Sequence, residues 1–90
     1  MATLRVPALM KMYIGNQSEV TLQGTTVAET LNDLIFRYPA IKFHLYDDHG
    51  ELRRHINLFV NEVNIKDLNG IQTPICDFDR LILLPSISGG

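Results

Sequence analysis

The sequence has very little cysteine, and its histidines show no metal-binding pattern. Cys76 is the only cysteine among the 90 residues, so neither an intrachain disulfide nor a multi-cysteine zinc site can form. Because no base neighbours Cys76 in the sequence, we expect an inert thiol in the core or in a loop. The spacing of His44, His49 and His55 matches no zinc motif. We therefore predict no bound metal, and the composition suits a reducing cytoplasm.

The sequence also lacks an excess of basic residues and any long apolar run. Eight Lys and Arg residues against ten Asp and Glu residues give a formal net charge of -2. This balance excludes the strongly basic surface that binds a nucleic-acid backbone. The basic doublet Arg53-Arg54 is interpreted as a solvated loop or strand edge, in preference to a phosphate site. No window approaches the roughly 20 apolar residues that span a bilayer, so we expect neither nucleic acid nor membrane as a partner.

Catalytic motifs are missing as well. The sequence contains no glycine-rich phosphate loop and no serine nucleophile elbow. A domain of this size also leaves little room for an enclosed active site. We therefore predict that the protein is not an enzyme, that it binds no cofactor, and that its function lies on a surface or at a chain end.

What the sequence does contain is enough apolar material for one packed core. Hydrophobic residues make up 46% of the chain, and no internal repeat, low-complexity tract or linker interrupts it. The last five residues, 86–90, are mostly small and have nothing to hold them in a core. We therefore expect one domain over 1–85, followed by a flexible tail over 86–90.

Five segments have the residue pattern of β-strands. Polar and apolar residues alternate along the first three, and the last is a nearly continuous apolar run that suits a central strand covered on both faces. Turns are expected around Gly15-Asn16, Asp47 to Gly50, Glu62-Val63 and Asn69-Gly70. The strands are predicted over 3–6, 19–23, 56–61, 64–66 and 80–85.

A helix is predicted between the second and third strands. Thr26 and Glu29 form a capping box, which satisfies free amides at a helix start, so the helix should begin near Val27. Pro39 should end it. Its apolar face, which should cover the sheet, consists of Val27, Leu31, Leu34, Ile35 and Tyr38. The sequence thus predicts an α+β fold.

The strand over 56–61 is expected to leave one aromatic side chain outside the core. Its period of two places Ile56, Leu58 and Val60 on the core face and Phe59 on the other. We predict that Phe59 belongs to a partner surface; the alternative, an aromatic side chain packed beside a neighbouring loop, stays open.

The C-terminal Gly89-Gly90 is the strongest functional signal. Two residues without Cβ atoms can thread a channel too narrow for any side chain. Five extended residues reach roughly 17 Å, far enough to enter the cleft of another protein. A carboxylate is unreactive toward nucleophiles until a partner activates it with ATP, as an acyl adenylate. The alternative is a chain end without function.

Two stretches carry a resemblance to a known family. The C-terminal half, with Gly70, Pro74, Asp77-Phe78-Asp79 and residues 84–90, resembles the MoaD and ThiS family of ubiquitin-like sulfur carriers. The stretch 52–61 looks like the branch of that family that carries sulfur for cysteine biosynthesis. The resemblance covers essentially the whole chain. It implies a β-grasp fold, in which a mixed sheet is covered by one main helix.

The resemblance also implies a chemistry for the tail. An E1-like adenylating enzyme of the MoeB or ThiF type would use ATP to activate Gly90, and a sulfur donor would convert it to a thiocarboxylate. Gly89, Ser88 and Ile87 would thread the active site of the partner. The downstream enzyme would be a PLP-dependent cysteine synthase, which we favour, or the large subunit of molybdopterin synthase.

The sequence departs from the family at Phe78, where the family usually has a glycine, so the turn before the last strand should differ. Two further functions stay open. The chain could be a ubiquitin-like modifier that is conjugated to other proteins through Gly90, or a β-grasp module that only binds. The first passes through the same acyl adenylate, whereas the second would not need the tail.

Overall fold

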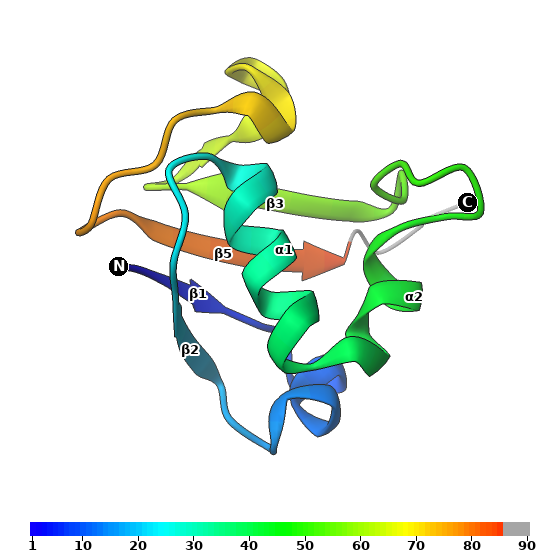
Figure 1. Ribbon diagram of the computed structural model, residues 1–90. Helices are drawn as coiled ribbons and strands as arrows, with labels where there is room; N and C mark the ends of the chain where they lie inside the picture. The colour runs from blue at the N-terminus through cyan, green and yellow to red at the C-terminus, as the bar shows by residue number, and fades with distance from the viewer. Residues whose placement is uncertain (86–90) are drawn as a thin grey trace.

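The computed structural model describes residues 1–85. A five-stranded sheet with strand order β2-β1-β5-β3-β4 lies against helix α1 (Figure 1). Strand β5 pairs in parallel with β1 and antiparallel with β3, and the other pairs are antiparallel. The predicted α+β architecture, a mixed sheet covered by one main helix, is therefore confirmed. The strands are β1 Ala2–Arg5, β2 Glu19–Leu22, β3 Ile56–Val60, β4 Val63–Asn64 and β5 Arg80–Pro85.

Helix α1 spans Val27–Arg37, within one residue or two of the predicted bounds. The hydroxyl of Thr26 accepts a hydrogen bond from the Glu29 amide at 3.2 Å, as the capping box predicts. The Glu29 carboxylate does not return to the Thr26 amide, however. It accepts hydrogen bonds from both the amide and the hydroxyl of Thr25, each at 2.9 Å. The partner of the Glu29 carboxylate is therefore the residue before the one that the capping box predicts.

The core lies between α1 and the sheet. The predicted apolar face is confirmed, since Val27, Leu31 and Leu34 are buried while Ile35 and Tyr38 pack partly buried against the core. Every second residue of β3 and β5 completes this core from the sheet side. The sheet residues buried there are Ala2, Leu4, Val20, Leu22, Ile56, Leu58, Val60, Leu81 and Leu83.

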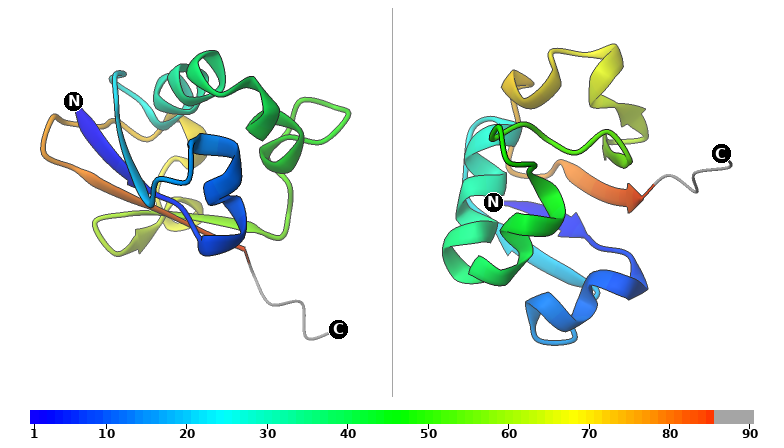
Figure 2. Two further views of the ribbon diagram at one scale, coloured as in Figure 1. Left: turned by 90° about the horizontal axis from the view of Figure 1, so that it is seen from below. Right: turned by 90° about the vertical axis from the view of Figure 1, so that its right-hand side faces the viewer.

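The prediction for the last strand is only half right. Strand β5 is central, but it is not covered on both faces. Leu81 and Leu83 are buried, whereas Ile82 is half-buried and the Leu84 side chain is 45% exposed. The reason is that α1 lies against one face of the sheet (Figure 2). The opposite side, called the open face below, leaves alternate β5 side chains accessible.

The short elements differ most from expectation. The predicted strand over 64–66 is wrong, because β4 ends at Asn64, whose side chain accepts a hydrogen bond from the Lys66 amide at 2.9 Å and starts a 3-10 helix. The tight turn before β4 is formed by Asn61 and Glu62, both with positive φ. The remaining short helices are η1 Ala8–Ile14, η2 Pro39–Ile41, α2 Lys42–Leu45, η3 Ile65–Asp67 and η4 Gly70–Gln72.

Candidate functional site

The residues predicted to carry the chemistry, Gly90 with Gly89, Ser88 and Ile87, lie outside the described residues. The structure does place the point at which the chain leaves the sheet. Pro85, the last residue of β5, pairs with Ile56, the first residue of β3. The tail therefore starts from the end of the central strand.

The end of β5 is held from one side only. Strand β3 pairs with it as far as Pro85, but the pairing with β1 stops at Ile82, which is opposite Arg5. Pro7, two residues after the end of β1, has no N–H group to continue a ladder. A shallow hollow of about 420 Å³ lies at this gap, and its lining includes Arg5, Pro7, Lys11, Ile82 and Leu84.

Phe59 lies on the open face, as the period of two predicts. It pairs with Ile82, and Asn57 pairs with Leu84, so these four side chains share one face. Phe59 itself is half-buried, and Leu84 is the most accessible apolar side chain of the group. The orientation of Phe59 is confirmed, while its role in binding a partner stays a prediction.

Two arginines that the sequence reasoning missed lie beside this apolar group. Arg5 and Arg80 are exposed on the open face. The alternation along β1 could have placed Arg5 there, whereas the continuous apolar run of β5 carries no such signal for Arg80. Glu19 is opposite Arg5 in the register of β1 and β2. Within residues 1–85, neither arginine forms an ion pair within 4.0 Å. The open face therefore combines an apolar centre with positive charge.

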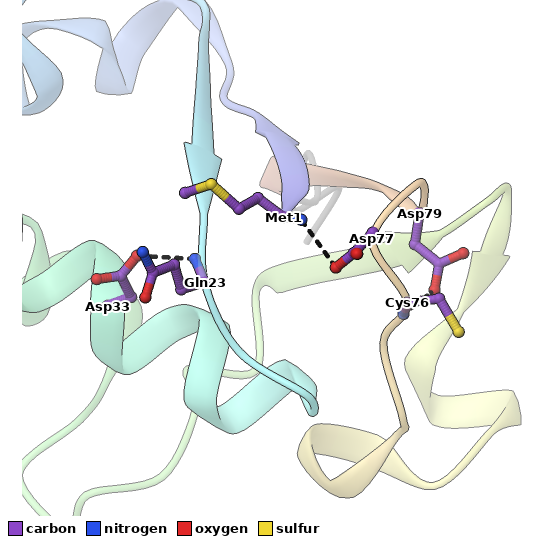
Figure 3. Close-up of polar contacts among 6 residues, drawn as sticks. All are labelled: Met1, Gln23, Asp33, Cys76, Asp77 and Asp79. Atoms are coloured by element: carbon purple, nitrogen blue, oxygen red, sulfur yellow. Dashed lines mark hydrogen bonds and ion pairs between the residues drawn. The ribbon is translucent and has the colours of Figure 1, made fainter.

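The turn that leads into β5 closes without a glycine. The Cys76 amide donates to the Asp79 carboxylate at 2.7 Å, and the Asp79 amide donates back to the Cys76 carbonyl at 3.1 Å. The Met1 ammonium group forms an ion pair with Asp77 at 2.8 Å, which ties the start of β1 to this turn (Figure 3). Phe78 is 96% exposed and has no positive φ. Its substitution for glycine therefore leaves the turn formed, and Cys76 is exposed in the loop.

Side chains suited to metal chemistry do not gather in the described part of the chain. No group of three or more His, Cys, Asp or Glu residues within 1–85 could hold a metal ion. His44 instead stacks on Tyr13, with ring centroids 4.2 Å apart. The same residues contain no helix that is long and apolar enough to cross a membrane.

Comparison with known proteins agrees with this geometry. The model of the ThiS family matches residues 4–90. The sulfur carrier protein CysO of Mycobacterium tuberculosis is 31% identical over 90 residues, which cover 98% of this chain and 97% of that protein.

Two solved structures confirm the β-grasp fold. One is the crystal structure of the BexX/CysO complex of Amycolatopsis orientalis, with a TM-score of 0.91, 30% identity and complete coverage of both chains. The other is small archaeal modifier protein 1 of Methanosarcina acetivorans, with a TM-score of 0.85 and 32% identity over 99% of this chain and 95% of that one.

Proposed function

The chain belongs to the ThiS family, whose relatives include sulfur carrier proteins, and we propose that it carries sulfur as a thiocarboxylate on Gly90. The observation that carries the proposal is the extent of the similarity. The family match runs to residue 90, so it includes the Gly-Gly end, and the CysO match covers nearly the whole of both proteins. The protein is then a cosubstrate of other enzymes and needs no catalytic side chain.

The proposed chemistry has two steps. A carboxylate oxygen of Gly90 attacks the α-phosphate of ATP in an E1-like enzyme of the MoeB or ThiF type, forming an acyl adenylate and releasing pyrophosphate. Sulfide from a sulfur donor then attacks the acyl carbon, and AMP leaves with the bonding electron pair. Loss of the sulfur-bound proton gives a thiocarboxylate, which is ionised at neutral pH and is a good nucleophile.

The fold supports such a carrier in two ways. The pairing of Pro85 with Ile56 fixes the origin of the tail at the end of the central strand, so a partner that binds the domain also aims the tail. The open face offers that partner an apolar centre at Phe59, Ile82 and Leu84, with Arg5 and Arg80 beside it. Interfaces of this kind typically combine aromatic and arginine contacts.

Within this function we favour the cysteine-biosynthesis branch. The similarity to CysO and the residue pattern over 52–61 support it. The thiocarboxylate would then attack an activated serine derivative on a PLP-dependent cysteine synthase. In the crystal structure of the BexX/CysO complex, a CysO protein of this fold is assembled with a partner protein. A role as the small subunit of molybdopterin synthase is the alternative within the family.

A second function, conjugation to other proteins through Gly90, is supported by the similarity to small archaeal modifier protein 1. Both functions begin with the same acyl adenylate, and they differ in the nucleophile that follows. A modifier would form covalent adducts with lysine side chains. Such adducts would survive on a denaturing gel, whereas a thiocarboxylate carrier would migrate as a single free chain.

The deciding experiment is intact-protein mass spectrometry after incubation with ATP, an E1-like enzyme and a sulfide source. We expect one oxygen of the Gly90 carboxylate to be replaced by sulfur. A variant with one alanine added after Gly90 is the control, because its Gly90 carbonyl is blocked in a peptide bond. A folded wild-type protein that gains no sulfur with any of several activating enzymes would contradict the proposal.

A further inference from the structure

A second hollow lies on the helix-covered side of the sheet, where β3 meets the helices η3 and η4. Its volume is about 250 Å³. The floor is apolar and includes Ile56, Leu58 and Ile65, all of which are buried. Because Phe59 points to the opposite side of β3, this hollow is distinct from the open face. We call it the basic hollow, after the charges described next.

The charge around the basic hollow is opposite to that of the whole chain. Its lining includes Arg53, Arg54 and Lys66, which are three of the eight Lys and Arg residues, and none of the ten Asp and Glu residues. The chain as a whole has a net charge of -2. Positive charge is thus concentrated around an apolar floor.

Arg54 and Lys66, two of these three cations, have no acidic partner among residues 1–85. The Arg53 side chain donates to the Phe43 carbonyl at 2.9 Å. Its charge also helps to lower the pKa of Asp47, although the backbone N–H of Glu51 is the larger cause. Arg54 and Lys66 are exposed, and neither forms an ion pair within 4.0 Å with any residue of 1–85. These two cations are free to bind an external anion.

The backbone beneath the cations is fixed. The Arg53 amide donates to the Leu45 carbonyl at 2.8 Å, and the Arg53 carbonyl accepts from the Ile56 amide at 3.0 Å. Lys66 is the second residue of η3, and its amide donates to the Asn64 side chain at 2.9 Å. A preorganised rim reduces the entropy that binding costs.

The basic hollow lies beside the point at which the tail leaves the domain. Ile56 belongs to its floor and is the residue that pairs with Pro85. Any enzyme that takes Gly90 into its active site must approach the domain near this pair. The hollow is also smaller than the roughly 300–1,000 Å³ typical of small-molecule sites, and it suits a single apolar side chain. A segment of that enzyme is therefore a better fit than a free metabolite.

From these observations, and resting on the proposed function, we propose that the basic hollow binds an acidic segment of the activating enzyme. One apolar side chain of the segment would lie on the floor, and flanking carboxylates would pair with Arg54 and Lys66. Charge-assisted hydrogen bonds of this kind fix the register of two proteins and speed their association. The contact would position the tail without taking part in the chemistry.

Adenylation kinetics would test this proposal with the full chain. The double variant Arg54→Glu and Lys66→Glu reverses both free cations. Lys42→Glu, an exposed reversal on α2 outside the hollow, is the control for the effect of a single charge reversal elsewhere. With an E1-like enzyme that activates the wild type, we expect the double variant to raise the KM for the carrier by about tenfold or more at low salt. The kcat should stay near the wild-type value, and Lys42→Glu should change KM less than about twofold.

The outcomes separate this inference from the proposed function. The inference alone would be overturned if the double variant and Lys42→Glu had equal KM values. The wild type must then be activated normally, and all variants must be folded in a thermal melt. Normal activation with slower sulfur transfer to the acceptor enzyme would overturn the choice of the activating enzyme as occupant. Failure of the wild type with every activating enzyme would overturn both proposals.

Discussion

At the scale of residues, the start of α1 shows how one glycine redirects a cap. Gly24 has a φ of +147, and a Cβ atom there would lie 2.7 Å from the Thr30 amide nitrogen. The chain therefore passes close over the first turn of the helix, which brings the Thr25 amide to the Glu29 carboxylate. The spacing of Thr26 and Glu29 alone predicts the cap residue correctly. It could not predict this close approach, which depends on the path of the preceding loop.

The Glu29 carboxylate makes folding stability depend on pH. The hydrogen bond from the Thr25 amide, followed by that from the Thr25 hydroxyl, lowers the pKa of Glu29 from its usual 4.5. The ammonium group of Met1 similarly lowers the pKa of Asp77. A pKa that is lower in the folded state contributes stability above the unfolded pKa, and this contribution is lost as the pH falls through the folded pKa.

We therefore expect the urea midpoint of unfolding to fall between about pH 5 and pH 3. Glu29→Gln should lower the midpoint at pH 7 and make it less dependent on pH. Glu62→Gln is the matched control, because the Glu62 carboxylate accepts no hydrogen bond from any residue of the described chain. If the urea midpoints of the wild type and Glu29→Gln depended on pH in the same way, the hydrogen bonds from Thr25 to Glu29 would contribute nothing to the pH dependence.

At the scale of elements, β3 and β5 divide their side chains between two functions. One set packs against α1 and the other forms the open face. The alternation along β3 could be predicted from sequence because it has a strict period of two. The face on which each β5 residue lies could not be predicted in this way. A continuous apolar run does not show which face is covered until the register with β3 is known.

The division of β3 predicts opposite effects for two adjacent residues. Phe59→Glu should change the free energy of unfolding by no more than about 1 kcal/mol, because the side chain lies on the open face. It should raise the KM for adenylation by about tenfold, as expected for an aromatic interface residue. Leu58→Ala should instead cost about 2–5 kcal/mol of stability, because Leu58 is buried in the core.

Urea unfolding and adenylation kinetics on both variants would check this prediction. A Phe59→Glu protein with wild-type KM and a much lower unfolding midpoint would show that Phe59 is a packing residue, the alternative that the sequence left open.

The short elements were the least predictable. Helices η3 and η4 and strand β4 contain two or three residues each, too few for a periodic pattern to form. Their geometry follows from local hydrogen bonds, such as the one from the Lys66 amide to Asn64, and from packing against β3. The basic hollow lies among these elements, so no pattern in the sequence indicates that Arg54 and Lys66 belong to one site.

At the scale of the whole molecule, stability and the proposed chemistry belong to separate parts of the chain. Every buried apolar residue of the described core lies between Ala2 and Leu83. The tail could be proposed from sequence as the reactive part, because the proposed chemistry needs only a carboxylate and two glycines. The docking surfaces could not, because they are assembled from strands and loops that are distant in sequence.

This separation predicts the effect of removing residues 86–90. The melting temperature should stay within about 2 °C of the wild-type value, while ATP-dependent activation should be lost. Calorimetry and the mass-spectrometric assay on the same preparation would measure both. A truncated protein that melts much earlier would show that the tail contributes to the folded domain.

The position of β5 also has a consequence for how the chain reaches its native state. The hairpin β1–β2 and the hairpin β3–β4 are joined in the sheet only through β5, and isolated two-stranded hairpins are marginally stable in water. Thr3 pairs with Arg80, so the sheet closes across almost the entire sequence. A chain broken before β5 would be left with two unsupported hairpins and would be open to proteolysis. Folding itself would then act as quality control, retaining the molecules in which synthesis has continued at least through β5, the strand from which the tail starts.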